Sequence, residues 1–231
     1  MDIRILHGSE GAQSASGLTV VIDVFRAFSV ACYILSQGAE RIIAVREVER
    51  AWQLKHTHPD YLLIGERHST KVPGFDYGNS PTELQGADLS GKTVIQTTHA
   101  GTQSLLAAHK APEVITGSFV NAGAIIRYIR KSPFNELSLV CAGFRDEGEA
   151  LEDTLCAHYI RDSLTGQPRP FDEIVEQLRL SGSAARFFDP REDASPESDF
   201  WLCLRLDRFS FVIRGTAVQA GSCVLEKVAV D

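Results

Sequence analysis

Acidic, basic and hydroxyl side chains recur at a few points of this chain, each shortly after a run of apolar residues. In chain order they are Asp23 and Arg26, then Glu66 and Arg67, then Thr97, Thr98 and His99, then Ser118 and Asn121, and finally Glu152 and Asp153. Arginines, hydroxyl groups and the N–H groups at a helix start bind the oxygens of a phosphate. Carboxylate oxygens are the ligands that Mg²⁺ prefers. The pattern therefore indicates metal-assisted chemistry on a phosphate ester.

The stretch from Gly65 to Leu84, GERHSTKVPGFDYGNSPTEL, is too rich in glycine, proline and charge for a strand or a helix. It carries a further carboxylate, Asp76, and a carboxamide, Asn79. It ends in SPTE, which begins at Ser80 and matches a capping box with proline at the first helical position. The stretch therefore predicts a long loop that enters a helix and offers free N–H groups to an anion. The alternative is a surface loop with a good cap.

Apolar runs and helical spacings alternate along the first two thirds of the chain. The expected strands are 3–6 at an edge of the sheet, 18–22, 42–45, 62–64, 93–96, 114–116 and 137–141. The expected helices cover 25–35, 47–55, a segment ending at 109, a segment ending at 130, and 150–163. This alternation predicts an α/β fold of three layers, α/β/α, with a mostly parallel or mixed sheet and helices on both faces. Ligands of such sheets bind beyond the carboxyl ends of the strands, where the polar side chains cluster.

The alternation breaks after residue 164, where prolines and polar stretches interrupt it. A helix is expected at 172–180, and two late strands, 209–213 and 224–230, are expected to pair antiparallel at an edge of the sheet. No linker is visible, so we expect one domain over residues 1–231. It would consist of a regular α/β part (1–165) and a C-terminal part of helices and edge strands (166–231).

The composition limits the classes of function. With 231 residues, 44% of them hydrophobic, the chain can bury a core, and its net charge of −7 argues against a nucleic-acid surface. No apolar run approaches the roughly 20 residues that span a bilayer, and the N-terminus lacks the apolar core of a signal peptide. The five cysteines form no CxxC pair, so we expect reduced thiols in a cytoplasmic protein without membrane contact. The sequence alone does not decide between a monomer and a homo-oligomer.

The motifs of several familiar phosphate enzymes are absent from the sequence. There is no GxxxxGK[ST] loop, and no GxGxxG follows the run at 18–22. Asp23-Val24-Phe25 is not a double-aspartate nucleophile motif. Cys141 stands too close to Arg145 for a cysteine phosphatase loop, and we expect Cys141 to be a buried structural thiol.

Each candidate also has a purely structural interpretation. Asp23 is a favoured helix cap, and Arg26 could pair with a nearby acid. Glu152 and Asp153 stand in a first helical turn, where the helix dipole favours acids. As adjacent residues they point in different directions, so we expect at most one of them to face a metal directly.

Several segments together resemble the 2-phosphosulfolactate phosphatase family. They are VVIDVFRAFSV (Val20 to Val30), GERHSTKVPGFDYGNSPTEL (Gly65 to Leu84), QTTHAGTQ (Gln96 to Gln103), ITGSFVNAGA (Ile115 to Ala124), and the CAG of Cys141 to Gly143 with the downstream Glu152-Asp153. GFDxGNSPxE combined with VIDVxRA is the specific part. The resemblance implies a three-layer α/β/α fold and a magnesium-dependent phosphatase. It also implies a small anionic substrate, a sulfonated phospho-hydroxy acid on the path to coenzyme M.

For such a phosphatase, we expect Asp23 and Asp76, with Glu66 or one of Glu152 and Asp153, to hold Mg²⁺ beside an activated water. The residues expected to contact the substrate are Arg26, Arg67, Asn79, Ser80, Thr97, Thr98, His99 and Asn121. An aspartyl-phosphate on Asp23 is the alternative to activated water. The substitutions Asp23→Asn and Asp76→Asn are expected to abolish activity and to leave the fold intact.

The sequence departs from the family pattern at two points. The loop at 97–102 reads TTHAGT, one residue longer than the usual TTNGT, with His99 where an asparagine is expected. Ala157 is followed by His158 instead of glycine. The longer loop leaves two alternatives: a different phospho-acid substrate, or an altered member that binds an anionic metabolite without turnover. A kinase or isomerase of phospho-acids is a third alternative, which lacks the support of a nucleotide loop.

Overall fold

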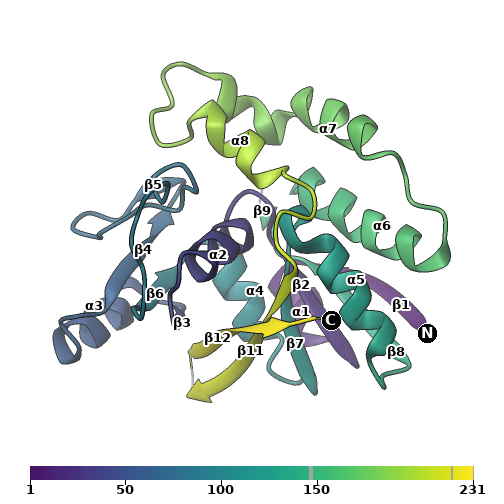
Figure 1. Ribbon diagram of the computed structural model, residues 1–231, viewed down its shortest axis with the longest axis horizontal. Coiled ribbons are helices and arrows are strands. Elements are labelled where there is room, and N and C mark those ends of the chain that lie inside the picture. The colour runs from purple at the N-terminus through teal and green to yellow at the C-terminus, as the bar shows by residue number, and fades with distance from the viewer. Residues whose placement is uncertain (146–147, 220, 231) are drawn as a thin grey trace.

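A mixed sheet of ten strands runs through the middle of the protein (Figure 1). The computed structural model describes residues 1–145, 148–219 and 221–230. The strands are β1 (Asp2–His7), β2 (Leu18–Ile22), β3 (Arg41–Val45), β4 (Leu62–Arg67), β5 (Thr70–Lys71), β6 (Thr93–Thr97), β7 (Glu113–Gly117), β8 (Glu136–Cys141), β11 (Phe211–Gln219) and β12 (Ser222–Ala229). Their order in the sheet is β1-β8-β2-β7-β11-β12-β3-β6-β4-β5. Two short strands, β9 (Phe144–Arg145) and β10 (Gly148–Glu149), form a separate pair.

Helices cover both faces of this sheet, as predicted. One face shares a hydrophobic core with α1 (Gly8–Gln13), α2 (Ala27–Ser36) and α4 (Gly101–Ala107). The opposite face packs against α3 (Val48–Thr57), α5 (Ala122–Lys131) and α6 (Leu151–Thr165). The later part of the chain adds α7 (Phe171–Arg179), the 3₁₀ segment η2 (Gly182–Phe188) and α8 (Glu197–Cys203), while a short 3₁₀ turn, η1 (Phe119–Asn121), precedes α5. The three-layer α/β/α architecture is confirmed, with α7 and α8 lying at one end of it (Figure 1).

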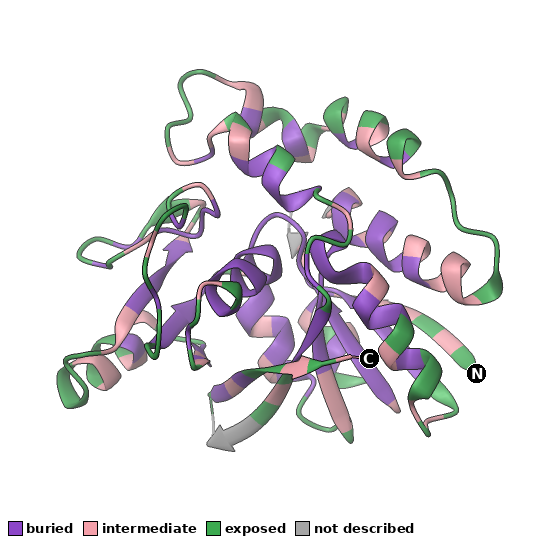
Figure 2. Ribbon diagram, in the orientation of Figure 1, coloured by how far each residue is buried: buried purple, intermediate pink, exposed green. Residues whose placement is uncertain are grey.

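The strand at 18–22 shows why continuous apolar runs form the centre of the sheet. All of its residues are buried, because helices cover both of its faces (Figure 2). Val20 and Ile22 belong to the core beneath α5 and α6. Val21, which points the opposite way, belongs to the core beneath α2 and α4. Within the described residues no helix combines the length and the apolar composition needed to cross a membrane.

The two late strands form a hairpin in the middle of the sheet, so their predicted position at an edge is wrong. β11 pairs antiparallel with β7, and β12 pairs antiparallel with β3. The hairpin therefore separates two parallel groups, β1-β8-β2-β7 and β3-β6-β4. Residues 213–215 contact the first group and residues 222–225 the second, so the two groups attach at different points along the hairpin. The edge position predicted for the first strand is confirmed.

The predicted helix after the long loop does not form. Residues 81–86 are a series of turns, although the Oγ of Ser80 accepts a hydrogen bond from the N–H of Glu83 at 3.3 Å. The carboxylate of Glu83 accepts its bond from the N–H of Gly78 at 2.8 Å, and not from Ser80 as a capping box requires. The helices α1 and α8 were not expected, since α1 contains two glycines and α8 lies in a proline-rich, polar stretch.

The central position of the hairpin predicts an unequal cost of two matched substitutions. Ile213 in β11 is fully buried, whereas Ile3 in the edge strand β1 is only partly buried. Ile213→Ala should lower the free energy of unfolding by roughly 3 kcal/mol or more, and Ile3→Ala by about 1 kcal/mol. Urea denaturation of both variants measures the difference. Equal losses would contradict a central hairpin.

Candidate functional site

A cavity of about 390 Å³ opens at the carboxyl ends of β2, β4 and β8, beside η2 of the later chain. We call it the acidic cavity. Its lining residues are Asp23, Phe25, Arg26, Glu66, Ser69, Asn79, Ala100, Gly143, Ala150, Glu152, Asp153, Gly182, Ser183 and Arg186. Its lining thus combines four carboxylates with two arginines, contributed by segments that are far apart in the sequence.

Asp23 lies between β2 and the start of α2 and is only 6% exposed. Its Oδ1 accepts a hydrogen bond from the N–H of Ala27, the first residue of α2, at 3.0 Å, although the N-cap position itself is Arg26. Burial raises the pKa of Asp23 from its ordinary 3.8 to about 6, and the charges of Glu152 and Glu66 add to the shift. The Ala27 bond and the charge of Arg186 oppose it. A carboxyl group that exchanges its proton near pH 6 suits acid–base or nucleophilic chemistry.

The N-terminus of α4 approaches Asp23 closely, at Gly101. A Cβ atom at this position would lie 2.6 Å from Oδ2 of Asp23 and 2.8 Å from the Cβ of Ala27. Only glycine therefore fits between the two helix starts without displacing the carboxylate. The TTHAGT loop is thereby held against the acidic cavity.

Glu152 and Asp153 stand in the first turn of α6, and both line the cavity. Asp153 is bound by two main-chain groups: its Oδ1 accepts from Val24 N at 2.8 Å and its Oδ2 from Gly143 N at 2.9 Å. Burial raises the pKa of Asp153 well above its usual range, and the charges of Asp23 and Glu152 raise it further. Asp153 therefore ties the loops after β2 and β8 together through its carboxyl group.

Glu66 holds two other loops at the cavity. Its Oε1 accepts from the N–H of His99 at 2.8 Å, and its Oε2 accepts from the N–H of Ser69 at 2.7 Å. Ser69 and His68 form the tight turn between β4 and β5, with positive φ at both residues. The turn brings the exposed rings of His68 and His99 to a centroid distance of 5.2 Å, next to residues that line the cavity.

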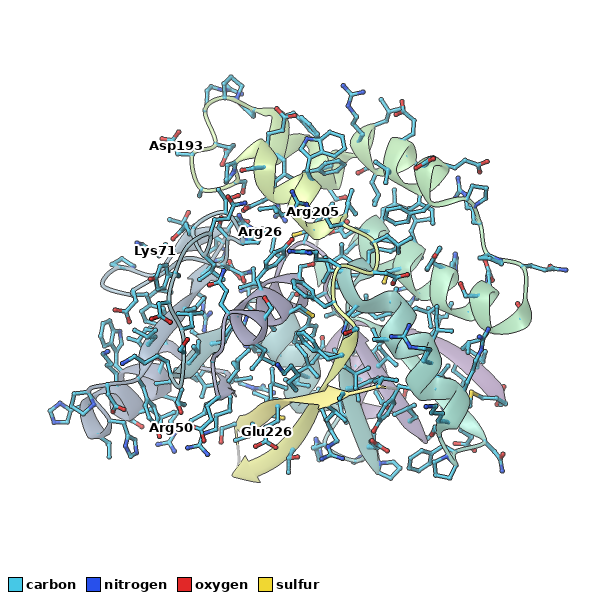
Figure 3. The ribbon with its side chains drawn as sticks, in the orientation of Figure 1. Arg26, Arg50, Lys71, Asp193, Arg205 and Glu226 are labelled. Atoms are coloured by element: carbon cyan, nitrogen blue, oxygen red, sulfur yellow. The ribbon has the colours of Figure 1, made fainter. Side chains whose placement is uncertain are left out.

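Arg26 is buried between α2 and α8 (Figure 3). Its Nη1 donates to Oδ2 of Asp199 at 2.5 Å and to the carbonyl oxygen of Ala194 at 2.9 Å. Pairing with an acid was the structural alternative for Arg26, and that pairing is present. Arg26 nevertheless lines the acidic cavity, so it is available to a ligand as well.

Asn79 reaches the cavity, while its neighbour Ser80 faces the other way. The Oδ1 of Asn79 is buried and has no hydrogen-bond partner among the residues that the structure describes. The Oγ of Ser80 donates to Oδ1 of Asp199 at 2.8 Å. The GNSP segment therefore offers one polar atom to the cavity and uses the next in the structure around it.

Asp76 and Arg67 are not brought to the cavity. The side chain of Asp76 is 37% exposed, lies 3.9 Å from Nζ of Lys55, and accepts a hydrogen bond from Leu63 N at 2.8 Å. Leu63 is at the beginning of β4, whereas the cavity lies at its end. The guanidinium of Arg67 donates to three oxygens, those of Glu66 (main chain), Arg46 (main chain) and Thr97 (Oγ1).

The other predicted contacts with the substrate are absent from the lining of the cavity, namely Thr97, Thr98, His99 and Asn121. Thr98 binds the first turn of α4, where its Oγ1 accepts from the N–H of Thr102 at 3.2 Å. Asn121 accepts from Ser118 N at 3.2 Å and donates to the carbonyl of Phe211 at 3.4 Å, which joins its loop to β11. These residues order the loops around the site.

Comparison with known proteins extends the resemblance over nearly the whole chain. A family model described as 2-phosphosulpholactate phosphatase matches residues 5–216. The chain belongs to the 2-phosphosulfolactate phosphatase family. It is 32% identical over 215 residues to a protein of Bacillus subtilis, with 93% of each chain covered. It is 33% identical over 225 residues to a protein of Thermoplasma acidophilum, with 96% of this chain and 97% of the relative covered. Both relatives are named "Probable 2-phosphosulfolactate phosphatase".

Arg186 is a lining residue of this family member that sequence reasoning missed. It donates to the carbonyl oxygen of Phe25 at 2.9 Å and to Oγ of Ser69 at 3.2 Å, and it lies over the ring of Phe187. Its charge lowers the pKa of Asp23, so the two groups are close enough to interact. The only local signal was an arginine after the small residues SGSAA, and nothing in that stretch indicates which strand end it meets.

The donor set of the acidic cavity fits magnesium in its chemistry. Within the described residues no three His, Cys, Asp or Glu side chains are arranged to hold a metal on their own. Mg²⁺ commonly binds through one or two carboxylates and keeps several waters, so a complete protein cage is not required. Asp23 and Glu152 are close enough for the charge of one to raise the pKa of the other, which is the repulsion that a divalent cation relieves.

The raised pKa of Asp23 predicts a pH-dependent stability difference. Between about pH 3.8 and 6 the unfolded chain has lost this proton while the folded protein keeps it, so the Asp23 contribution to stability falls as pH rises. Asp23→Asn removes this loss and keeps an acceptor for Ala27. Above pH 6 the free energy of unfolding of the variant should exceed that of the wild type by at most about 3 kcal/mol. Below pH 4 this difference should vanish.

Urea denaturation in EDTA from pH 4 to pH 7.5 measures this difference. Asp76→Asn is the matched control, because it makes the same change outside the cavity, and its difference from the wild type should not follow this profile. If Asp23→Asn and wild type are equally stable at pH 7.5, ionisation of Asp23 does not destabilise the folded protein.

Proposed function

We propose that this protein hydrolyses a small phosphomonoester that carries a second acidic group, with 2-phosphosulfolactate as the first candidate. The observation that carries the proposal is the acidic cavity, where the raised-pKa carboxyl of Asp23 lies beside Arg26 and Arg186. The volume of about 390 Å³ suits a small metabolite. Membership of the phosphatase family and the names of the two relatives support the same reaction.

In the proposed reaction, water adds to phosphorus, the bond from phosphorus to the ester oxygen breaks, and a proton passes to the leaving alcohol. Arg26, Arg186 and Asn79 are the groups that would bind and orient the anionic oxygens. In its ionised form, which a pKa of about 6 makes accessible near neutral pH, Asp23 would accept the proton of the attacking water and pass it to the leaving alcohol. Exclusion of water from the cavity would strengthen each of these electrostatic interactions.

We propose Mg²⁺ as the cofactor, held by Asp23 and Glu152, with Glu66 and Asp153 completing the negative surroundings. When bound, the ion would neutralise charge on the phosphate oxygens and lower the pKa of water. The roles of Glu66 and Asp153 would be to hold the loops of the site in place, because each already accepts two N–H groups.

An aspartyl-phosphate on Asp23 stays the alternative to direct attack by water. Oδ1 of Asp23 is used by the N–H of Ala27, so Oδ2 would be the attacking atom. Rapid quenching with ³²P-labelled substrate, followed by peptide mapping, separates the two routes. Label on the peptide that contains Asp23 would exclude direct attack by water.

The cysteines support a location in a reducing compartment. All five are buried free thiols, including Cys141, the predicted structural thiol. We therefore propose that the protein acts in the cytoplasm on a soluble metabolite, in agreement with a place on the path to coenzyme M.

Matched substitutions at Asp23 and Asp76 test the proposed reaction. Asp23→Asn should lower kcat/KM for 2-phosphosulfolactate by roughly 100-fold or more, because it removes the group that holds the proton. Asp76→Asn, which the sequence motif predicts to abolish activity, should instead keep kcat/KM within about threefold of wild type, since Asp76 lies outside the cavity. Phosphate release with Mg²⁺ and with EDTA measures both.

Other small phosphomonoesters serve as alternative substrates in the same assay. Phosphate release from another ester alone would support the proposed hydrolysis but show that 2-phosphosulfolactate is not the substrate. If no ester releases phosphate while phospho-acids raise the melting temperature, the protein binds such acids without turnover.

Magnesium binding has a readout that does not depend on turnover. Millimolar Mg²⁺ should raise the melting temperature of the wild type by mass action, by roughly 2–4 °C for each 1 kcal/mol of binding free energy. Glu152→Gln should raise the melting temperature in EDTA, because it removes repulsion on Asp23, and should reduce the shift caused by Mg²⁺. Asp76→Asn should respond as wild type does. A full magnesium shift in Glu152→Gln would remove Glu152 from the metal site.

A further inference from the structure

The strongest unexplained feature near the acidic cavity is the buried ion pair between Arg26 and Asp199. Their side chains are 2% and 0% exposed, and the two residues are 173 positions apart in the sequence. A fully buried ion pair is a poor source of stability, because dehydrating both charges offsets most of their attraction. Its presence beside the cavity therefore requires an explanation other than stability.

Asp199 is held by contacts of its own from residues 80–82. Its Oδ1 accepts from Oγ of Ser80 at 2.8 Å and from the N–H of Thr82 at 3.0 Å. Its Oδ2 accepts from Arg26. The carboxylate is therefore fixed by one loop and directs its second oxygen at the arginine.

The guanidinium of Arg26 is held through its Nη1 atom. Its Nη1 is occupied by Asp199 and by the carbonyl of Ala194, and the ring of Phe187 lies 5.8 Å from its central carbon. A guanidinium is a planar fork of five N–H donors, so fixing one nitrogen fixes the direction of the others. Arg26 lines the acidic cavity, where those other donors meet a ligand.

We propose that Asp199 is a positioning residue that aims Arg26 at the phosphate of the substrate, with Ser80 holding Asp199 in place. This inference rests on the proposed function and adds a role for the C-terminal segment in it. The N–H donors of a held fork lose less entropy on binding a phosphate than those of a mobile side chain. Asp199 itself touches no reacting atom.

The test is a double-mutant cycle with Asp199→Asn and Arg26→Gln. Asp199→Asn has the same shape and removes the charge, and it should raise KM more than it lowers kcat, with kcat/KM falling roughly 10- to 100-fold. In the Arg26→Gln background the same change should lower kcat/KM by less than about twofold, because the group that it positions is gone. A purely structural role would give the same loss in both backgrounds, and that additive result would overturn the proposal.

Asp189→Asn is the matched control in the same segment. Asp189 pairs with Arg191 at the surface and does not line the cavity, so the change should leave kcat/KM within about twofold. If Asp199→Asn does not fold, Ser80→Ala replaces it in the cycle, since it removes one bond to Asp199 and keeps both charges. Ser80→Ala should lower kcat/KM about threefold with Arg26 present, and not at all with Arg26→Gln.

Calorimetric binding of inorganic phosphate distinguishes this proposal from failure of the proposed function. If the wild type hydrolyses no ester but binds phosphate, and the affinity follows the same non-additive cycle, the proposed function fails and the positioning role stands. If the wild type binds no phosphate, both fail. If phosphate binds equally to wild type and Asp199→Asn, the positioning role is wrong whatever the activity.

Discussion

The crowding of four carboxylates into one largely buried cavity is the constraint from which the rest of the site follows. An ionised carboxylate loses hydration when it is buried, and neighbours of the same charge add to the penalty. The raised pKa values of Asp23 and Asp153 express this penalty directly. The chain offsets it with main-chain donors: the N–H groups of Ala27, Val24, Gly143, Ser69 and His99 all bind carboxylates of the cavity.

Those donors explain why the loops after four different strands must meet. Asp23, Glu66 and Asp153 accept N–H groups from their own or neighbouring loops, so charge and loop conformation are determined together. The C-terminal segment joins the same arrangement, because Arg186 binds the main chain of Phe25 and Asp199 binds Arg26. The distinction between a regular part, 1–165, and a C-terminal part, 166–231, is therefore a distinction of sequence pattern and not of function.

The sequence predicted what depends on local pattern and on the geometry of α/β sheets. The run at 18–22 is a central strand, and Asp23 and Glu66 reach the cavity because the carboxyl ends of parallel strands gather ligand-binding groups. The insertion of the β11–β12 hairpin was not predictable in the same way, since strand propensity does not say which neighbour a strand selects. Arg186 was missed for the same reason, because its position depends on tertiary contacts alone.

Asp76 and Ser80 show a different limit, that of a motif. Both belong to the GFDYGNSP segment, and both are used to shape the surroundings of the site: Asp76 binds Leu63 N, and Ser80 binds Asp199. A motif marks residues that a family requires, and a residue that holds a loop is required as strictly as one that touches a ligand. Only the direction of the side chain separates the two, and the Asn79 side chain beside them is the one that lines the cavity.

Repulsion among the carboxylates also connects protons to the proposed metal. Without a metal, Asp23 keeps its proton up to about pH 6, because burial and the neighbouring carboxylates disfavour its ionised form. A divalent cation would relieve the same repulsion and must displace the proton, so its binding would release protons and tighten as pH rises through this range. The free energy that destabilises the site through this repulsion would thus become a source of affinity for the cation, and the phosphate would then enter a cavity whose negative charge had already been reduced.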